Sequence, residues 1–221
     1  MSDLEFRREI VRIGRMLHEK GFIAAMDGNI SVRLNDYTVL STPTCMSKGM
    51  LNEEDLVTVD MRGKKLSGFR EVSSEIAMHL MIYRVRPDIG AVVHAHPPTA
   101  TGFAAAGRAL DEALVSEIVI SLGSVPLAEY GTPGTEELCD NIEPYVEEND
   151  AVLMANHGVV TYGDDLLRAY MNMETVEHFA KISLVAHQLG TKRTLSEERV
   201  RSLIDIRNRL REVRMLQKNR A

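Results

Sequence analysis

Two histidines, His94 and His96, flank Ala95 at the end of an apolar segment, residues 89–96. Alternate side chains of an extended strand point to the same face, so both imidazoles lie on one side, with Cβ atoms about 6 to 7 Å apart. Two imidazoles at this spacing can chelate one metal ion. The alternative is a pair of histidines at the rim of a sheet that hydrogen-bond to the backbone.

A third histidine, His157, ends a second apolar segment and precedes Gly158, whose missing side chain leaves room beside a site. Three imidazoles with an open position are a common catalytic zinc arrangement, and the carboxylate of Glu75 could complete the ligand set. Other divalent transition metals also accept imidazole and carboxylate ligands. Glu75 has a simpler alternative role, because an acidic residue in the first turn of a helix complements the helix dipole.

Hydroxyl and amide side chains form a second candidate site, for an anion. Ser73 and Ser74 lie at the predicted start of a helix, where hydroxyls and free backbone N–H groups bind phosphate. Asn29 follows Gly28, and Thr44 ends a Thr-Pro-Thr segment, so both could supply further donors. Taken singly, each of these residues is typical of a turn.

The hydrophobic periodicity predicts the helices and strands that position these residues. We expect helices from a capping box at residues 2–5 to Gly21, from a Ser73 N-cap to Pro87, and over 99–106, 135–145 and 164–189. We expect a hairpin over residues 30–41 and strands over 56–60, 89–96, 115–120 and 151–157. This order favours a mixed or antiparallel sheet covered by helices.

Composition excludes several classes of protein. The chain has 221 residues, a net charge of −6 and 5% aromatic residues, which argues against a nucleic-acid binder. No apolar run approaches the roughly 20 residues of a membrane span, and the N-terminus has no apolar secretion signal. Cys45 and Cys139 lie far apart, so we expect reduced thiols in a cytoplasmic protein. No dinucleotide-binding fingerprint follows a predicted strand.

The charge is unevenly distributed along the chain. Residues 199–221 hold eight Lys or Arg and two Asp or Glu, a charge of +6, which leaves −12 on the preceding 198 residues. We therefore expect one domain over residues 1–195 and a basic amphipathic helix over 196–221 that packs on an acidic neighbour. The apolar residues at helical spacing in this segment are Leu203, Ile206, Leu210, Val213 and Leu216.

Five short motifs occur in one order along the chain. They are Gly28-Asn29-Ile30-Ser31, Thr42-Pro43-Thr44, Ser73-Ser74-Glu75, His94-Ala95-His96-Pro97 and Asn156-His157-Gly158. Together they resemble the class II aldolase/adducin-head family over about residues 5 to 190, and its L-fuculose-1-phosphate aldolase branch in particular. The resemblance implies a three-layer α/β/α sandwich with a largely antiparallel central sheet, a catalytic domain over 1–195, and a homotetramer with active sites between subunits.

The same resemblance implies residue roles. Zn²⁺ would be held by Glu75, His94, His96 and His157, and the phosphate of a ketose 1-phosphate would lie among Gly28, Asn29, Thr44, Cys45, Ser73 and Ser74. The metal would act as a Lewis acid while the bond between C3 and C4 breaks to give dihydroxyacetone phosphate and an aldehyde. Glu75 would exchange the proton on the dihydroxyacetone phosphate carbon. No lysine Schiff base is required, so we expect Lys48 to be a surface or phosphate-attracting charge.

The sequence departs from the family at two places. Cys45 stands where related aldolases usually have glycine, and cysteine does not adopt a positive φ freely. The tyrosines that handle the aldehyde end have no counterpart in residues 115–118 or after Tyr170, so a deoxyribulose phosphate competes with fuculose phosphate as substrate. Glu117 in that stretch is either an acid or base that faces the site or an exposed carboxylate on an edge strand.

Three other functions stay open. A related dehydratase has a glutamate near the position of Glu117, but that branch lacks the glutamate of the metal site. The epimerase branch has aspartates where this chain has Glu75 and Ser124. Adducin heads resemble the fold without serving as aldolases, and the intact set of one glutamate and three histidines argues against such an interaction module.

Overall fold

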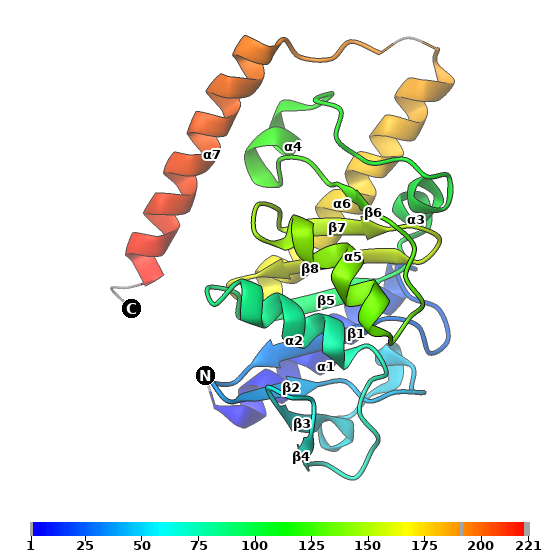
Figure 1. Cartoon of the computed structure of the whole chain (residues 1–221), viewed down its shortest axis with the longest axis vertical. Coiled ribbons are helices and arrows are strands. Elements are labelled where there is room, and N and C mark those ends of the chain that lie inside the picture. Colours follow the sequence, from blue (N-terminus) through cyan, green and yellow to red (C-terminus); the bar gives the residue numbers. More distant parts are fainter. Residues whose placement is uncertain (1, 191, 219–221) are drawn as a thin grey trace.

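Eight strands form one sheet in this computed structural model, which describes residues 2–190 and 192–218 (Figure 1). The strands are β1 (Asn29–Arg33), β2 (Thr38–Ser41), β3 (Val57–Asp60), β4 (Lys65–Ser67), β5 (Ala91–Ala95), β6 (Leu127–Ala128), β7 (Ala151–Met154) and β8 (Gly158–Gly163). Their order is β4-β3-β2-β1-β5-β8-β7-β6, and only β6 and β7 pair in parallel among these strands. The predicted largely antiparallel sheet is confirmed.

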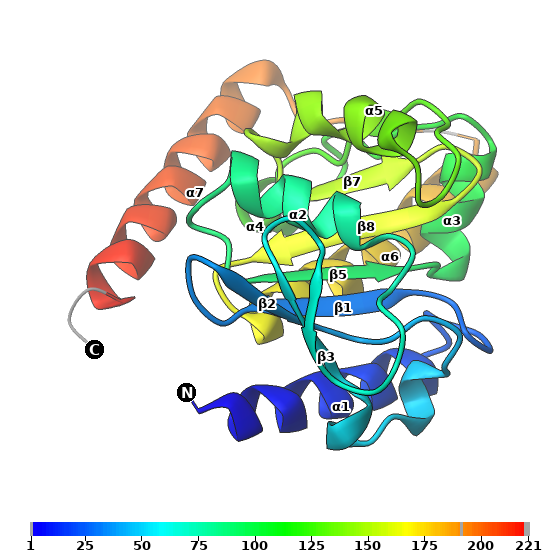
Figure 2. The same ribbon diagram turned by 60° about the horizontal axis from the view of Figure 1, so that its bottom comes forward.

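Helices cover both faces of the sheet. They are α1 (Asp3–Glu19), α2 (Ile76–Val85), α3 (Pro98–Ala105), α4 (Ser116–Ser121), α5 (Glu136–Val146), α6 (Leu166–Gln188) and α7 (Glu197–Lys218), with short 3-10 helices η1 (Lys48–Met50) and η2 (Glu53–Asp55). One apolar core lies between the sheet and α2 and α5, and the other lies between the sheet and α1, α3, α4 and α6. Figure 2 shows α1 and α2 on opposite faces, which confirms the expected three layers.

Local sequence features set the ends of several helices. Ser2 and Glu5 form a reciprocal capping box at the start of α1, and Gly21, with φ 68°, follows its end. The side chain of Asp165 caps the first turn of α6, and Gly190, with φ 80°, follows that helix. These helices therefore begin and end close to the predicted residues. Within the described part of the chain, no helix is long and apolar enough to cross a membrane.

The prediction of a strand over residues 115–120 is wrong, because this stretch forms helix α4. Ile118 and Leu122 lie four residues apart and both belong to the core beneath the helix. The β-branched residues favour a strand locally, but packing of this apolar face decides the conformation. Glu117 accordingly lies in the first turn of a helix, not on an edge strand.

The segment predicted as one strand over residues 151–157 is the first half of a hairpin. Strand β7 ends at Met154, and β8 begins at Gly158 and pairs with both β7 and β5. Asn156 occupies the left-handed region with φ 55°, which turns the chain between the two strands. His157 therefore lies in the hairpin turn and not at a strand end.

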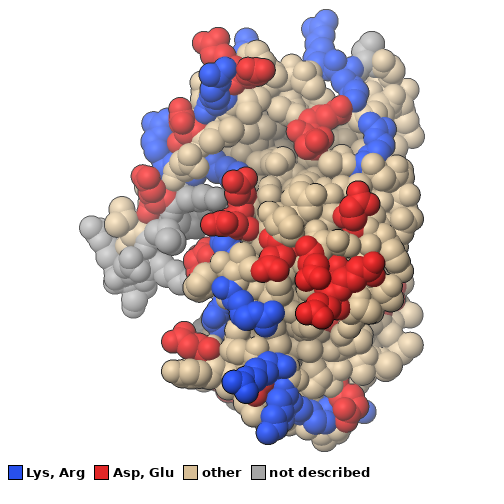
Figure 3. Space-filling view, viewed as in Figure 1, with Lys and Arg blue, Asp and Glu red and all other residues tan. Residues whose placement is uncertain are grey.

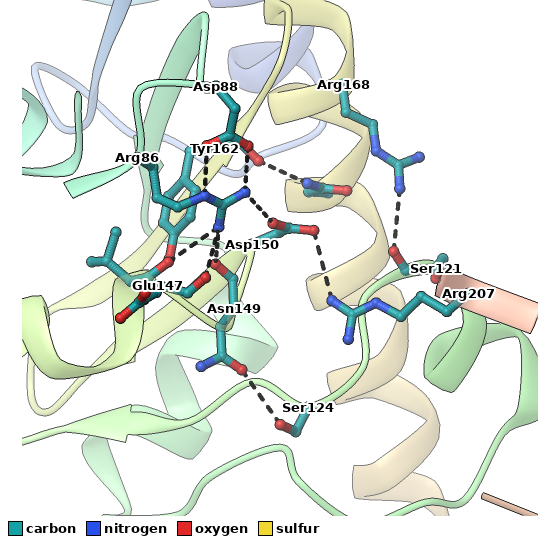
Figure 4. Close-up of polar contacts among 12 residues, drawn as sticks. Arg86, Asp88, Ser121, Ser124, Glu147, Asn149, Asp150, Tyr162, Arg168 and Arg207 are labelled. Atoms are coloured by element: carbon teal, nitrogen blue, oxygen red, sulfur yellow. Dashed lines mark hydrogen bonds and ion pairs between the residues drawn. The ribbon is translucent and has the colours of Figure 1, made fainter. Parts of the chain in front are cut away.

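Helix α7 lies beside the body and packs against α4 (Figure 1). Its Arg207 lies 3.7 Å from Asp150, whose other carboxylate oxygen lies 3.5 Å from Arg86 (Figure 4). Arg86 also donates to the carbonyls of Val146, Glu147 and Asn149 at the end of α5. Gly123, with φ 86°, passes directly beside the Arg207 guanidinium, where a Cβ would meet Nη1 at 2.3 Å. These contacts attach the predicted C-terminal helix to the body of the molecule.

The surface carries both signs of charge. On the face shown in Figure 3, acidic side chains gather over the middle of the body and basic side chains gather at the lower end. The division of the chain into a domain over residues 1–195 and an extension over 196–221 stays a prediction.

Candidate active site

Three antiparallel strands meet at the end of the sheet that holds the candidate metal ligands. In the register of β1 and β5, Asn29 is the partner of His94. In the register of β5 and β8, Ala95 is the partner of Val159, so His96 and Gly158 lie at the same end. The amide N–H of His96 donates to the carbonyl of Phe22 at 2.8 Å, which fixes the chain as it leaves the sheet. Sheet pairing therefore brings together residues that lie far apart in the sequence.

His94, His96 and His157 form a compact cluster, with potential ligand atoms within 4.8 Å of one another. The Nε2 atoms of His94 and His96 lie 3.1 Å apart. His94 Nδ1 faces the Val159 carbonyl at 2.9 Å, and His96 Nδ1 lies 3.6 Å from Asp27 Oδ2. An acceptor beside Nδ1, such as the Val159 carbonyl, holds that ring nitrogen protonated and leaves Nε2 free to bind a metal.

The Glu75 carboxylate lies against this cluster. Oε2 is 3.4 Å from His94 Nε2, and Oε1 is 3.3 Å from His157 Nε2. The side-chain amide of Asn29 donates to Oε2 at 2.8 Å, whereas Oε1 is buried without a hydrogen-bond donor. An orphaned, buried carboxylate oxygen beside three imidazoles is the arrangement that a cation would satisfy.

Glu75 is the N-cap residue of α2, and Ser73 is not, which corrects the predicted cap. The carbonyl of Ser73 accepts from Ile76 N–H, and its hydroxyl accepts from Glu75 N–H at 3.4 Å. A tight turn therefore precedes the helix and places Glu75 at its start, not within its first turn.

Glycine is required beside the histidines. A Cβ on Gly158 would lie 2.5 Å from His96 Cδ2 and 2.7 Å from the Ala95 carbonyl oxygen. Gly28 has φ 69°, and a Cβ there would lie 2.7 Å from the carbonyl oxygen of His94. The room expected beside Gly158 is therefore filled by the imidazoles themselves.

Burial favours the neutral form of His94 and His157. Burial, followed by the neighbouring His157 and His96, holds the pKa of His94 well below its ordinary value. Burial also lowers the pKa of His157, although the Glu75 carboxylate opposes that shift. Neutral imidazoles are the form that binds metal. The nitrogen donors, the carboxylate and their protonation therefore fit a divalent transition metal such as zinc.

The candidate anion-binding segments also lie side by side. Thr42 pairs with Ile30 through N–H to carbonyl and N–H to hydroxyl hydrogen bonds. Pro43 forms an isolated bridge with Val72, and Thr44 N–H donates to the carbonyl of Glu71. The loops of Asn29, Thr44 and Ser73 are therefore neighbours, as binding of one phosphate would require. Ser74 and Cys45 are exposed, whereas Gly28, Asn29 and Ser73 are buried.

For the loop after Thr44, the structure gives the backbone conformation of Cys45 and excludes one of the two alternatives for Lys48, the surface charge. Cys45 does occupy the left-handed region, with φ 55°, so the loop keeps the conformation that glycine would give. Lys48 is not on the surface, because only 2% of it is exposed. Its ammonium donates to the carbonyls of Met26 and Met46.

Two further residues of the site were not predicted from the sequence. His79 is buried one helical turn after Glu75, and its Nδ1 lies 2.7 Å from the Ser31 hydroxyl. The i, i+4 spacing from Glu75 is the signal that could have identified it. Asp27, beside His96, precedes a motif glycine and carries no such pattern. Glu117 is exposed and lines a separate cleft of about 540 Å³ with Lys20, Glu174 and Lys181.

Comparisons with known proteins agree with this site and fold. Residues 8–184 match the model of the Class II Aldolase and Adducin N-terminal domain. An L-fuculose phosphate aldolase from Methanococcus maripaludis (strain C5) is 34% identical over 81% of this chain and 96% of its own. A 3-oxo-tetronate 4-phosphate decarboxylase from Haemophilus influenzae is 34% identical over 93% of this chain and 95% of its own.

A solved L-fuculose 1-phosphate aldolase superposes with a TM-score of 0.85 at 33% identity, over 93% of this chain and 96% of that one. The sheet order and the layers define a class II aldolase fold. The chain belongs to the class II aldolase and adducin N-terminal domain family.

Proposed function

We propose that this protein is a metal-dependent aldolase that cleaves a ketose 1-phosphate reversibly to dihydroxyacetone phosphate and an aldehyde. The observation that supports it best is the Glu75 carboxylate, held by Asn29 against His94 and His157. An adducin-like interaction module would not need such a buried set of ionisable groups. The neighbouring loops of Asn29, Thr44 and Ser73 supply hydroxyl and amide groups for a phosphate.

His94, His96, His157 and Glu75 would hold the metal, for which zinc is our choice. When bound, such a cation supplies Lewis-acid chemistry that stabilises negative charge developing on the carbonyl oxygen. Glu75 carries the proton: one carboxylate oxygen takes it from, or returns it to, the carbon of dihydroxyacetone phosphate. Asn29 orients that carboxylate through its hydrogen bond to Oε2.

The test combines metal content with product detection. Purified protein, before and after treatment with a chelator, is incubated with fuculose 1-phosphate and deoxyribulose 1-phosphate, and dihydroxyacetone phosphate is measured with a coupled enzyme. We expect activity that is lost with the metal and restored by zinc. His94→Ala should lose both metal and cleavage, whereas Glu75→Gln should retain most metal and lose turnover, roughly 10²-fold or more. A folded protein that neither binds zinc nor responds to the chelator would contradict the proposal.

Decarboxylation of a phosphorylated 3-oxo acid is the second candidate. The relative named as a decarboxylase aligns over 93% of this chain, whereas the aldolase of equal identity aligns over 81%. Both reactions break the bond between the α and β carbons of a ketone and leave an enediolate, so the same acid, base and metal ligands would serve both. The absence of a tyrosine in residues 115–118 also leaves the aldehyde end of the pocket undefined.

Product analysis separates the two reactions. Release of carbon dioxide from a 3-oxo-tetronate 4-phosphate, without cleavage of any ketose 1-phosphate, would replace the aldolase proposal by decarboxylation. Release of dihydroxyacetone phosphate with no carbon dioxide would support the aldolase.

A further inference from the structure

Lys48 is a buried cation for which the proposed chemistry has no role. Its Nζ donates to the carbonyl oxygens of Met26 at 2.5 Å and Met46 at 2.9 Å. No carboxylate of the described residues forms an ion pair with it within 4.0 Å. A buried ammonium without an ion-pair partner in contact loses hydration, and two carbonyl dipoles compensate only part of this loss. An ammonium has three N–H donors, and the described residues provide hydrogen-bond acceptors for two of them.

Close backbone packing fixes the position of this lysine. Helix η1, which begins at Lys48, lies on α1, where a Cβ on Gly14 would come within 2.4 Å of the Lys48 carbonyl oxygen. A Cβ on Gly49 would meet the His18 ring at 2.6 Å. Because η1 cannot move away from α1 without losing this contact, the side chain is directed from η1 across to the segment before β1.

The two carbonyls that Lys48 contacts belong to the candidate anion-binding loops. Met26 lies two residues before Gly28, and Met46 follows Cys45. The ammonium therefore ties these two loops to each other. Burial lowers the pKa of Lys48, and the negative charges of Asp27, Cys45 and Glu75 oppose that shift. The two hydrogen bonds therefore place the ammonium beside the candidate anion-binding loops.

We propose that Lys48 is a specificity-determining residue for the anionic end of the substrate, in which its ammonium attracts the anion and its two hydrogen bonds hold the loops that bind it. This inference rests on the proposed function. A phosphate dianion fits better than a carboxylate, because a tetrahedral group with double charge can use the lysine and the hydroxyl and amide donors of three loops. Because no carboxylate of the described residues lies within ion-pair distance of Lys48, a bound phosphate would supply its counter-charge.

Two variants separate the charge from the loop contacts. Lys48→Met removes both, whereas Lys48→Gln removes the charge but keeps an amide N–H₂ group that can still donate to a backbone carbonyl. Lys20→Met is the matched control, because it also removes one positive charge, from a half-exposed pair with Glu174. Thermal melting and metal content identify variants that fold and retain the site, and the Gln variant decides the result if the Met variant does not fold.

The measurements are the Kd of inorganic phosphate for the metal-loaded protein by calorimetry and the KM and kcat for the ketose 1-phosphate. We expect both Lys48 variants to weaken phosphate binding and raise KM at least tenfold, with unchanged metal content, and the Lys20 variant to stay within twofold of the original chain. Acetate titrated in parallel should bind weakly to all variants. A Lys48-dependent acetate affinity equal to that of phosphate would overturn the choice of phosphate.

Different results would overturn the inference about Lys48 and the proposed function. Cleavage of substrate by the original chain with unchanged KM and phosphate affinity in both Lys48 variants would overturn this inference alone. Failure of the original chain to bind phosphate or cleave any ketose phosphate would overturn the proposed function as well.

Discussion

At the scale of single residues, the site depends on which side chains are absent as much as on those that are present. The imidazole of His96 occupies the space where a side chain on residue 158 would start. Burial of His94 and His157 then keeps both rings neutral and ready to bind metal. The missing side chain of Gly158 and the burial of the histidines therefore both contribute to the candidate metal site.

Gly158→Ala should weaken metal binding roughly tenfold or more, because the new methyl group displaces His96 from the cluster. Zinc affinity, measured by competition with a chromophoric chelator, checks this. Gly102→Ala is the matched control: a Cβ there meets no heavy atom within 4 Å, and alanine favours helix α3. Equal zinc affinity in the two variants would show that the close approach at residue 158 is not needed.

His79 should make the free energy of unfolding depend on pH. Burial lowers its pKa to about 3, whereas the unfolded chain has the ordinary value of about 6.5. The unfolded state therefore binds the proton first as the pH falls below about 6.5, so the stability that is present above this pH is lost progressively towards pH 3. Between pH 6.5 and 5 this one group should cost about 2 kcal/mol.

Urea unfolding of chelator-treated protein at several pH values measures this dependence. In His79→Gln the slope of stability against pH should fall by about 1.4 kcal/mol per pH unit, although the variant is less stable at neutral pH because its contact with Ser31 changes. An unchanged slope would mean that His79 titrates normally in the folded chain.

The residues of the site were predictable to different degrees. The His-Ala-His and His-Gly motifs and Glu75 could be identified, because residue types that bind metal occur there at short spacing. The burial of Lys48 was not, because it follows from the contact of η1 with Gly14 of α1, a residue far away in the sequence. The positive φ of Cys45 was not predictable either, because residues other than glycine prefer a negative φ. This conformation costs roughly 1 to 3 kcal/mol, which the surrounding loop contacts must offset.

At the scale of elements, the buried carboxylate of Glu177 in α6 holds the start of α3. It accepts hydrogen bonds from the backbone N–H groups of Thr99 and Ala100, at 3.1 Å and 2.9 Å to Oε2. The N-cap residue Pro97 has no side chain able to do this. Because α3 begins directly after the His96-Pro97 step, this contact also supports the orientation of His96.

Glu177→Ala should lower the free energy of unfolding by about 1 to 2 kcal/mol through loss of the cap, and weaken zinc binding as His96 loses support. Glu177→Gln keeps an oxygen acceptor, so its free energy of unfolding should lie between those of the original chain and Glu177→Ala. Chemical unfolding and zinc competition measure both effects. Glu53→Ala, which removes a half-exposed ion pair with Arg8, serves as control and should cost under about 1 kcal/mol. A Glu177→Ala variant no less stable than this control would contradict the capping role.

Local sequence signals predicted elements where capping and periodicity agree, as in α1 and α6. They failed for residues 115–120, where packing of Ile118 and Leu122 on the core overrides β propensity. Strands β4 and β6 were not predicted, because segments of three and two residues are too short for a period to show.

At the scale of the whole molecule, α7 has an attached half and an exposed half. Arg207 reaches Asp150, and the helix packs on α4, whereas the exposed fraction of its apolar residues rises from 36% at Ile206 to 51% at Val213 and 61% at Leu216. In the sequence, residues 199–221 carry a charge of +6 and the preceding residues a charge of −12. An apolar stripe with basic flanks, left uncovered by its own chain, fits an acidic surface on a neighbouring copy.

Deletion of residues 199–221 should therefore dissociate the homotetramer that we expect, or lower turnover if the active site lies between subunits. Sedimentation velocity at several protein concentrations and the aldolase assay measure these two effects. A milder variant, Leu210→Ser with Val213→Ser, keeps the helix and the Arg207 contact but removes apolar area at two half-exposed positions. This variant should also weaken assembly, because the exposed apolar residues form the expected contact with the neighbouring copy. The Arg207 contact stays in place, so its loss cannot cause the effect. Unchanged assembly and unchanged turnover after the full deletion would show that α7 serves its own subunit alone.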